Sequence, residues 1–118
     1  MELEIAINDF VANLQSKMNE YYDKHLSSLN KPKIDIEYKE KWCKIVKSDC
    51  SSSSVYAWIA LQNFETKELG PVVAGDIHKP ASWKKPAKHA RGTVLNEATW
   101  QCAGPYAIEY LKGSSYKF

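Results

Sequence analysis

Apolar side chains recur at intervals of three and four over the first 26 residues. They are Leu3, Ile7, Phe10, Val11, Leu14, Met18, Tyr21 and Tyr22. This spacing is that of a single apolar stripe along an α-helix. No glycine or proline interrupts it, its first turn is acidic, and the polar residues 27–32 end it. We therefore predict an amphipathic helix from Leu3 to about Leu26, and such a helix usually covers a sheet.

After the predicted helix, apolar and polar residues alternate with a period of two. Ile34, Ile36 and Tyr38 alternate with acidic residues, which predicts a strand with one apolar and one solvated face. A second strand is predicted for residues 42–47, after a turn short enough for an antiparallel hairpin. Residues 55–62 are rich in β-branched and aromatic side chains and are predicted to form the central strand. Both faces of that strand are apolar, so we expect the helix to cover one and the C-terminal segment or a partner chain to cover the other.

Turn-forming residues dominate the later part of the chain. Residues 63–67 are predicted as a turn, and residues 69–79 as a bent edge strand or two short strands, because glycines interrupt them. Residues 80–91 contain two prolines and no aliphatic side chain larger than alanine, which excludes a central strand. We expect an irregular segment here, with one short helix from Pro86 to a Gly92 cap. A further short helix is predicted between Gly104 and Gly113.

These elements predict one α+β domain over residues 1–118: a long N-terminal amphipathic helix packed on a small antiparallel sheet, an irregular basic segment and a short C-terminal helix. With 118 residues, 44% hydrophobic and 25% charged, the composition is that of an ordinary globular domain. The longest apolar run, residues 55–61, is too short to span a bilayer, and the first residues lack the basic region of a signal peptide. We therefore expect neither a secreted protein nor a membrane partner.

Charge is distributed unevenly along the chain. The net charge is only +2, but residues 1–30 carry five acids against two lysines. Residues 77–92 carry five basic side chains and no acid, together with His78 and His89. This segment alone holds more than the net charge of the molecule, so any site for a polyanion is expected here.

No pattern of catalytic or metal-binding residues is recognisable. The three cysteines (Cys43, Cys50 and Cys102) cannot all pair, which favours a reducing compartment. Combined with His78 or His89, they match no common zinc spacing, and no nucleophile elbow, triad or phosphate loop joins them to a histidine. His89, between Lys88 and Arg91, is the one plausible acid–base group. We expect a protein without a cofactor, a metal or an enzymatic activity.

The basic segment also carries a motif. Gly75-Asp76-Ile77 leads into Ser82-Trp83-Lys84-Lys85-Pro86-Ala87-Lys88-His89-Ala90-Arg91-Gly92, and Gly104-Pro105-Tyr106 follows. This arrangement resembles a family of small, uncharacterised proteins of tailed bacteriophages, over about the C-terminal half of the chain and more weakly in the N-terminal helix. Residues 63–74 are longer than in the shortest members. The resemblance implies a phage origin and a shared fold, but no activity and no catalytic residue. Together with the reducing compartment that the cysteines favour, we expect the host cytoplasm as the location.

The side chains of this segment suit a phosphate-rich ligand. Lysine meets phosphate as a point charge, arginine as a bidentate fork, and an indole can stack on a base. The candidate ligand-binding residues are Lys79, Trp83, Lys84, Lys85, Lys88, His89 and Arg91. Four phosphate contacts would give a log–log salt slope of about −3, hence weak and salt-dependent binding.

Three other interpretations stay open. The segment can be a solvated basic loop that Trp83 pins to the core. The chain can instead be a phage-encoded interaction protein or inhibitor acting on a host protein, in which charge serves recognition. Between these lies a nucleotide-sequestering, anti-defence role, with the nucleotide held in a pocket beneath Trp83.

Overall fold

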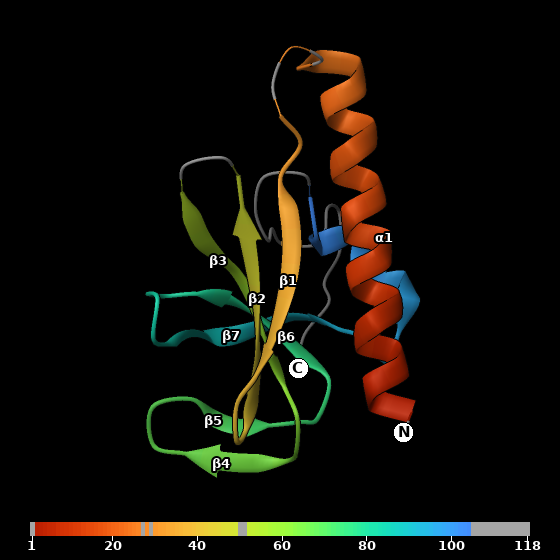
Figure 1. Cartoon of the computed structure of the whole chain (residues 1–118). Coiled ribbons are helices and arrows are strands. Elements are labelled where there is room, and N and C mark those ends of the chain that lie inside the picture. Colours follow the sequence, from red (N-terminus) through yellow and green to blue (C-terminus); the bar gives the residue numbers. More distant parts are fainter. Residues whose placement is uncertain (1, 27, 29, 50–51, 105–118) are drawn as a thin grey trace.

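The computed structural model describes residues 2–26, 28, 30–49 and 52–104. One long helix, α1 (Glu2–His25), lies along a five-stranded antiparallel sheet of order β1-β2-β3-β6-β7, with a separate two-stranded hairpin, β4-β5 (Figure 1). The strands are β1 (Lys33–Tyr38), β2 (Trp42–Ser48), β3 (Ser53–Ala60), β4 (Phe64–Thr66), β5 (Gly70–Val72), β6 (Asp76–Pro80) and β7 (Pro86–Thr93); a 3₁₀ helix, η1 (Glu97–Cys102), follows.

The fold class and the first half of the chain agree with the sequence predictions. The structure is α+β, and α1 ends within one residue of the predicted boundary. β1 and β2 form the predicted antiparallel hairpin, closed where the N–H of Lys39 donates to the carbonyl of Trp42 at 2.8 Å. β3 is the central strand of the sheet. The C-terminal helix predicted between Gly104 and Gly113 lies outside the described residues.

The prediction of an irregular basic segment with a short helix is wrong. Residues 76–93 form a hairpin of β6 and β7, in which Pro80 pairs with Pro86 beside the turn. The missing N–H groups of the two prolines are tolerated because they fall at the turn end of the hairpin, and because β7 is an edge strand of the described sheet. Gly92 is not a left-handed helix cap: it lies in β7 opposite Ile77, and its φ is not positive.

Two smaller expectations also change. Residues 64–66, predicted as part of a turn, form β4 and pair with β5. Residues 69–79 contain two short strands, as one of the two alternatives had it, but β6 lies inside the sheet between β3 and β7 rather than at an edge. Gly75 separates β5 from β6 and has a φ of +96°. A positive φ of this kind favours glycine, which has no Cβ atom.

The face of the sheet that α1 covers is the hydrophobic core. Four helix residues at the predicted spacing are fully buried: Ile7, Phe10, Leu14 and Met18. They pack on buried side chains of β2, β3 and β6, which pair across the sheet as Cys43 with Ile59 and Ile59 with Ile77. The ring of Phe10 also meets Trp100 of η1 edge-to-face, with 5.6 Å between ring centroids. This layer is continuous and apolar.

Polar side chains of α1 form hydrogen bonds with the segments packed beside the helix. Gln15 accepts a hydrogen bond from the N–H of Ile34 at 2.9 Å and donates one to the carbonyl of Pro32 at 2.8 Å. Lys17 donates to the carbonyls of Trp100 and Ala103 at the end of η1, at 3.1 and 3.2 Å. A cation suits this position because the last carbonyls of a helix lack partners within it. The helix therefore holds both β1 and the segment that follows β7.

The opposite face of the sheet has a different composition. Lys44, Trp58 and His78 lie side by side on it in β2, β3 and β6, as their pairing register shows. The ring of Trp42 meets those of Trp58, His78 and Phe64 edge-to-face, at centroid separations of 6.3, 5.1 and 5.6 Å respectively. We call this the aromatic face. Phe64 from β4 and Trp83 from the β6–β7 turn cover it in part, so the second covering layer includes elements that were not expected to provide it.

Candidate functional site

The structure gathers all seven predicted ligand-binding residues on the β6–β7 hairpin. Lys79 lies in β6; Trp83, Lys84 and Lys85 lie in the turn; Lys88, His89 and Arg91 lie in β7. All are exposed except Arg91, which is half-buried with an enclosed Nε atom. The hairpin forms one end of the described sheet, and so presents these side chains on one projecting structure (Figure 1).

Local hydrogen bonds fix the turn, residues 81–85. The carbonyl of Lys85 accepts bonds from the N–H groups of Ala81 and Ser82, at 2.9 and 3.1 Å. The hydroxyl of Ser82 accepts from the N–H groups of Lys84 and Lys85, at 3.2 and 3.1 Å. Serine commonly stabilises turns in this way. The backbone that carries Trp83 and two lysines is therefore a bonded turn.

Trp83 folds back over the aromatic face. The ammonium of Lys44 lies over its ring, 4.5 Å from the centroid, and 5.2 Å from the centroid of Trp58. Lys44 is only 6% exposed, whereas Trp83 is 48% exposed. A cation over an indole is attracted by the negative face of the ring, more strongly when water is excluded. Trp83 is thus anchored, as the solvated-loop interpretation expected. It is also accessible, as binding of a ligand requires.

Lys44 was missed from the sequence. A single lysine in a β-strand is usually solvated, and the run Trp42 to Val46 does not reveal which side chains lie beside it. The informative signal is the register, which places Lys44 opposite Trp58 and below the turn. Among the described residues Lys44 forms no ion pair, so indole rings take the place of a carboxylate.

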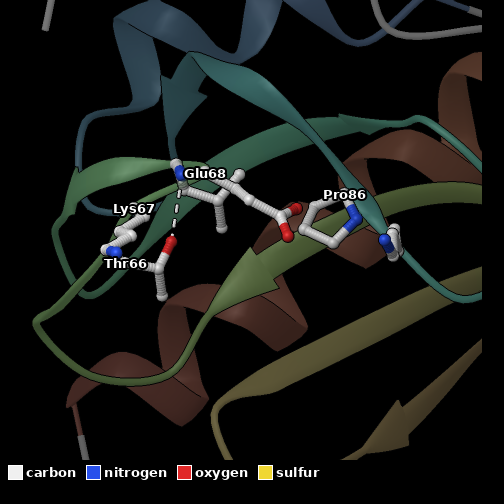
Figure 2. A pocket seen from close by; sticks show the side chains of 6 residues that line it. Thr66, Lys67, Glu68 and Pro86 are labelled. Carbon is white, nitrogen blue, oxygen red and sulfur yellow. Dashed lines mark hydrogen bonds between the residues drawn. The ribbon is translucent and has the colours of Figure 1, made fainter.

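The exposed lysines of the hairpin, Lys79, Lys84, Lys85 and Lys88, form no ion pair within the part of the chain that the structure describes. The ion pairs found there join Lys24 to Glu20, Lys31 to Asp23 and Lys39 to Glu37, all in or beside α1 and β1. The β4–β5 turn brings one acid near the hairpin: Glu68 reaches towards Pro86 and lines a pocket shared with Lys85 (Figure 2). In this turn the hydroxyl of Thr66 accepts a bond from the N–H of Leu69 at 2.9 Å (Figure 2).

His78 is a buried group whose protonation state follows from its contacts. It is 2% exposed, and its Nδ1 lies 2.7 Å from the carbonyl of Ala87, which can only accept, so Nδ1 carries the proton. Burial lowers the pKa of the imidazole, although the bond to Ala87 and the charge of Asp76 oppose that shift. The neutral Nε2 and the Nε1 of Trp58 have no hydrogen-bond partner among the described residues. His78 also lines a pocket of about 300 Å³ with Lys88 and His89.

The cysteine–histidine combinations considered for zinc or nucleophilic chemistry are not assembled around Cys43. Its thiol lies on the face that α1 covers, whereas His78 lies on the aromatic face. Burial raises the pKa of Cys43 to about 12, so the thiol is protonated at neutral pH. In the described ranges, no three histidine, cysteine, aspartate or glutamate side chains are arranged to hold a metal ion. Cys50 lies outside these ranges.

No helix in the described part of the chain is long and apolar enough to cross a membrane.

The basic hairpin lies within a region common to a protein family. No curated protein and no solved structure is significantly similar to the chain. A family model matches residues 1–104, which include α1, the sheet, the hairpin and η1. The chain therefore belongs to DUF7717, a family of unknown function.

Proposed function

We propose that the chain is a small, non-enzymatic bacteriophage protein that binds nucleic acid, or another phosphate-rich ligand, through the β6–β7 hairpin. One observation carries the proposal. The lysines at positions 79, 84, 85 and 88 are exposed on one hairpin, form no ion pair among the described residues, and flank a half-exposed indole. Elsewhere, Lys24, Lys31 and Lys39 are paired with acids.

The arrangement suits phosphate contacts better than a buried anion site. Exposed ammonium groups bind phosphate oxygens as mobile point charges and release counterions, which makes the affinity depend steeply on salt. Arg91 is half-buried, so the exposed lysines carry most of this interaction. With about four contacts on a single strand, the log–log salt slope is about −3.

The phage origin rests on the motif. The segment from Ser82 to Gly92 resembles tailed-bacteriophage proteins, and it coincides with the turn and β7 of the hairpin. A phage protein with this surface would meet its ligand in the host cytoplasm. The motif residues that determine the turn, Ser82 above all, are also those that hold the lysines in place.

Neutralising the hairpin tests the proposal. The triple variant K84Q/K85Q/K88Q is compared with K24Q/K31Q/K39Q, which removes the same charge from lysines that are already ion-paired. Binding of a labelled single-stranded oligonucleotide is followed by fluorescence anisotropy between about 50 and 200 mM salt. We expect the hairpin variant to lose about a hundredfold in affinity at about 50 mM salt, and its slope to fall from about −3 to about −0.7, the value for the one remaining contact. The control variant keeps most of its affinity.

Two outcomes would overturn the proposal. One is the absence of binding by the unaltered protein at low salt. The other is an equal loss in both triple variants, which would show a general charge effect without a site. A host protein retained on the immobilised chain after nuclease treatment, together with no oligonucleotide binding, would favour the alternative of a phage-encoded inhibitor.

A further inference from the structure

We infer that the hairpin prefers single strands, because an unpaired base fits against Trp83 in a hollow between the turn and the start of β3. This inference rests on the proposed function and specifies its ligand. The hollow has a volume of about 290 Å³ and is lined by Trp83, Ala81 and Ser82 of the turn, Pro80 of β6, and residues 53–55 of β3.

The lining matches the chemistry of a nucleobase. The indole and the proline ring provide flat apolar surface, and the hydroxyls of Ser53 and Ser54 can donate or accept at a base edge. The hydroxyl of Ser82 already accepts from two backbone N–H groups and can still donate. None of the lining side chains is charged, so phosphates are left to Lys84 and Lys85, which follow Trp83 in the chain. The volume lies at the lower end of the range of small-ligand pockets, about 300–1,000 Å³, and admits one base rather than a helix.

Strand selectivity follows from stacking. In a duplex the faces of each base are covered by its neighbours, so an aromatic side chain reaches a base face only after unstacking it. A single strand offers free base faces at every residue, and stacking on an aromatic ring tolerates any sequence. Phosphate contacts alone would make no such distinction in favour of the single strand, because a duplex carries the higher charge density.

Lys44 acts as a positioning residue. Its ammonium holds the Trp83 ring at 4.5 Å from the centroid, while its own side chain is nearly buried between that ring and Trp58. The bonded turn restrains the backbone of Trp83, and Lys44 restrains the ring. A ring that is already ordered loses less conformational entropy when a base stacks on it.

The decisive experiment compares three ligands of equal length: oligothymidylate, an abasic single strand with the same phosphates, and a duplex. We expect the unaltered protein to bind oligothymidylate about tenfold more tightly than the abasic strand, the effect of one stacked base. Trp83→Ala lowers the affinity for oligothymidylate to that for the abasic strand and leaves the salt slope unchanged. Trp83→Phe, which keeps an aromatic ring, gives an intermediate affinity.

A matched control uses another half-exposed aromatic residue. Tyr38 is 49% exposed, close to the 48% of Trp83, but lies in β1 at the other end of the sheet. Tyr38→Ala leaves all three affinities unchanged if stacking occurs in the hollow. Equal losses in Tyr38→Ala and Trp83→Ala, or equal affinities for oligothymidylate and the abasic strand, would overturn the inference.

The Lys44 variants separate positioning from charge. Lys44→Met removes the cation, and we expect it to weaken oligothymidylate binding several-fold while abasic binding and the salt slope stay the same. Lys44→Arg restores affinity, because a guanidinium also lies favourably over an indole. An equal loss for both strands would show that Lys44 contacts phosphate and would refute its positioning role. Loss of binding in K84Q/K85Q/K88Q with no effect of Trp83→Ala would refute the inference and leave the proposed function standing.

Discussion

The two faces of the sheet differ in what fills them. On the α1 face, Ile45, Ile59 and Ile77 meet the helix in a continuous apolar layer. One ring nitrogen on this side, the Nε1 of Trp100, is buried without a hydrogen-bond partner among the described residues. On the aromatic face, Lys44 and His78 are enclosed among indole rings, and the Nε2 of His78 and the Nε1 of Trp58 have no such partner. The first face is organised for stability. The second keeps groups that cost free energy to bury, which is the usual sign of a surface retained for another purpose.

The comparison also locates the exposed chemistry. The element that covers the first face is a helix of 24 residues, fixed by Gln15 and Lys17. The second face is covered partly by a short turn that carries Trp83 and two lysines. A ligand can compete with such a cover or extend it, whereas it has no access to the layer beneath α1.

The largest expected effect comes from the α1 face. Phe10 is 1% exposed and meets Trp100 edge-to-face, so Phe10→Ala leaves a cavity that the core cannot fill. We expect its free energy of unfolding in urea to fall by about 3–5 kcal/mol. Trp83→Ala removes a half-exposed ring and is expected to cost about 1 kcal/mol or less. Similar losses in the two variants would mean that the faces contribute equally to stability.

An intermediate effect comes from His78. Its pKa is lowered in the folded protein, so below about pH 6.5 the unfolded chain takes up a proton that the native imidazole refuses. Stability is therefore retained above about pH 6.5 and lost as the pH falls below it, by up to about 1.4 kcal/mol per pH unit.

The pH dependence is measured by urea unfolding from about pH 7.5 to 5.5, with His78→Asn as the comparison. The amide of asparagine can still donate a bond but does not titrate, so this variant should show a shallower dependence whatever its absolute stability. Burial raises the pKa of Asp76, and this has the opposite effect on stability, because it favours folding as the pH falls. The shift starts from the ordinary pKa of an aspartate, which is lower than that of a histidine. If the free energy of unfolding depended on pH equally in the two proteins, His78 would not be the group that causes the loss of stability.

The smallest effect is expected for Lys44→Met. Burying an ammonium without a carboxylate costs free energy, and the indole contacts recover only part of it. Methionine has a similar length and fills the same space without the charge. We expect the free energy of unfolding to stay within about 1 kcal/mol of the original or to rise. A large loss would show that the cation stabilises the aromatic face, and the contrast between the faces would then be one of composition only.

The parts that could be predicted are those in which a local pattern determines the structure. The three- and four-residue spacing from Leu3 to Tyr22 is sufficient for α1, and β-branched and aromatic residues are sufficient for β3. The hairpin of β6 and β7 could not be predicted in this way. Alanines and prolines have low strand propensity, and only pairing with β3, distant in sequence, makes residues 76–93 a hairpin.

The residues of the candidate site fall into the same two groups, those that a local pattern predicts and those that only the tertiary structure brings together. Its basic side chains follow from composition, because an acid-free run of five cations needs no structure to be recognised. Lys44, Ser53 and Ser54 join Trp83 only through strand register and the fold of the turn, which a single sequence does not encode locally. The direction in which Trp83 points therefore depends on the tertiary structure, whereas the location of the charge along the chain does not.

The irregular edge formed by β7 has a consequence for solubility. An edge strand exposes backbone groups that can pair with another chain, and proteins prevent this with bulges and lysines. β7 has both: its register with β6 shifts twice, and Lys88 projects from it in a part of the sheet where the described residues provide no further strand. The cations proposed to bind a ligand thus also protect the protein from self-association. Neutralised hairpin variants will consequently be the most prone to aggregate in concentrated solution.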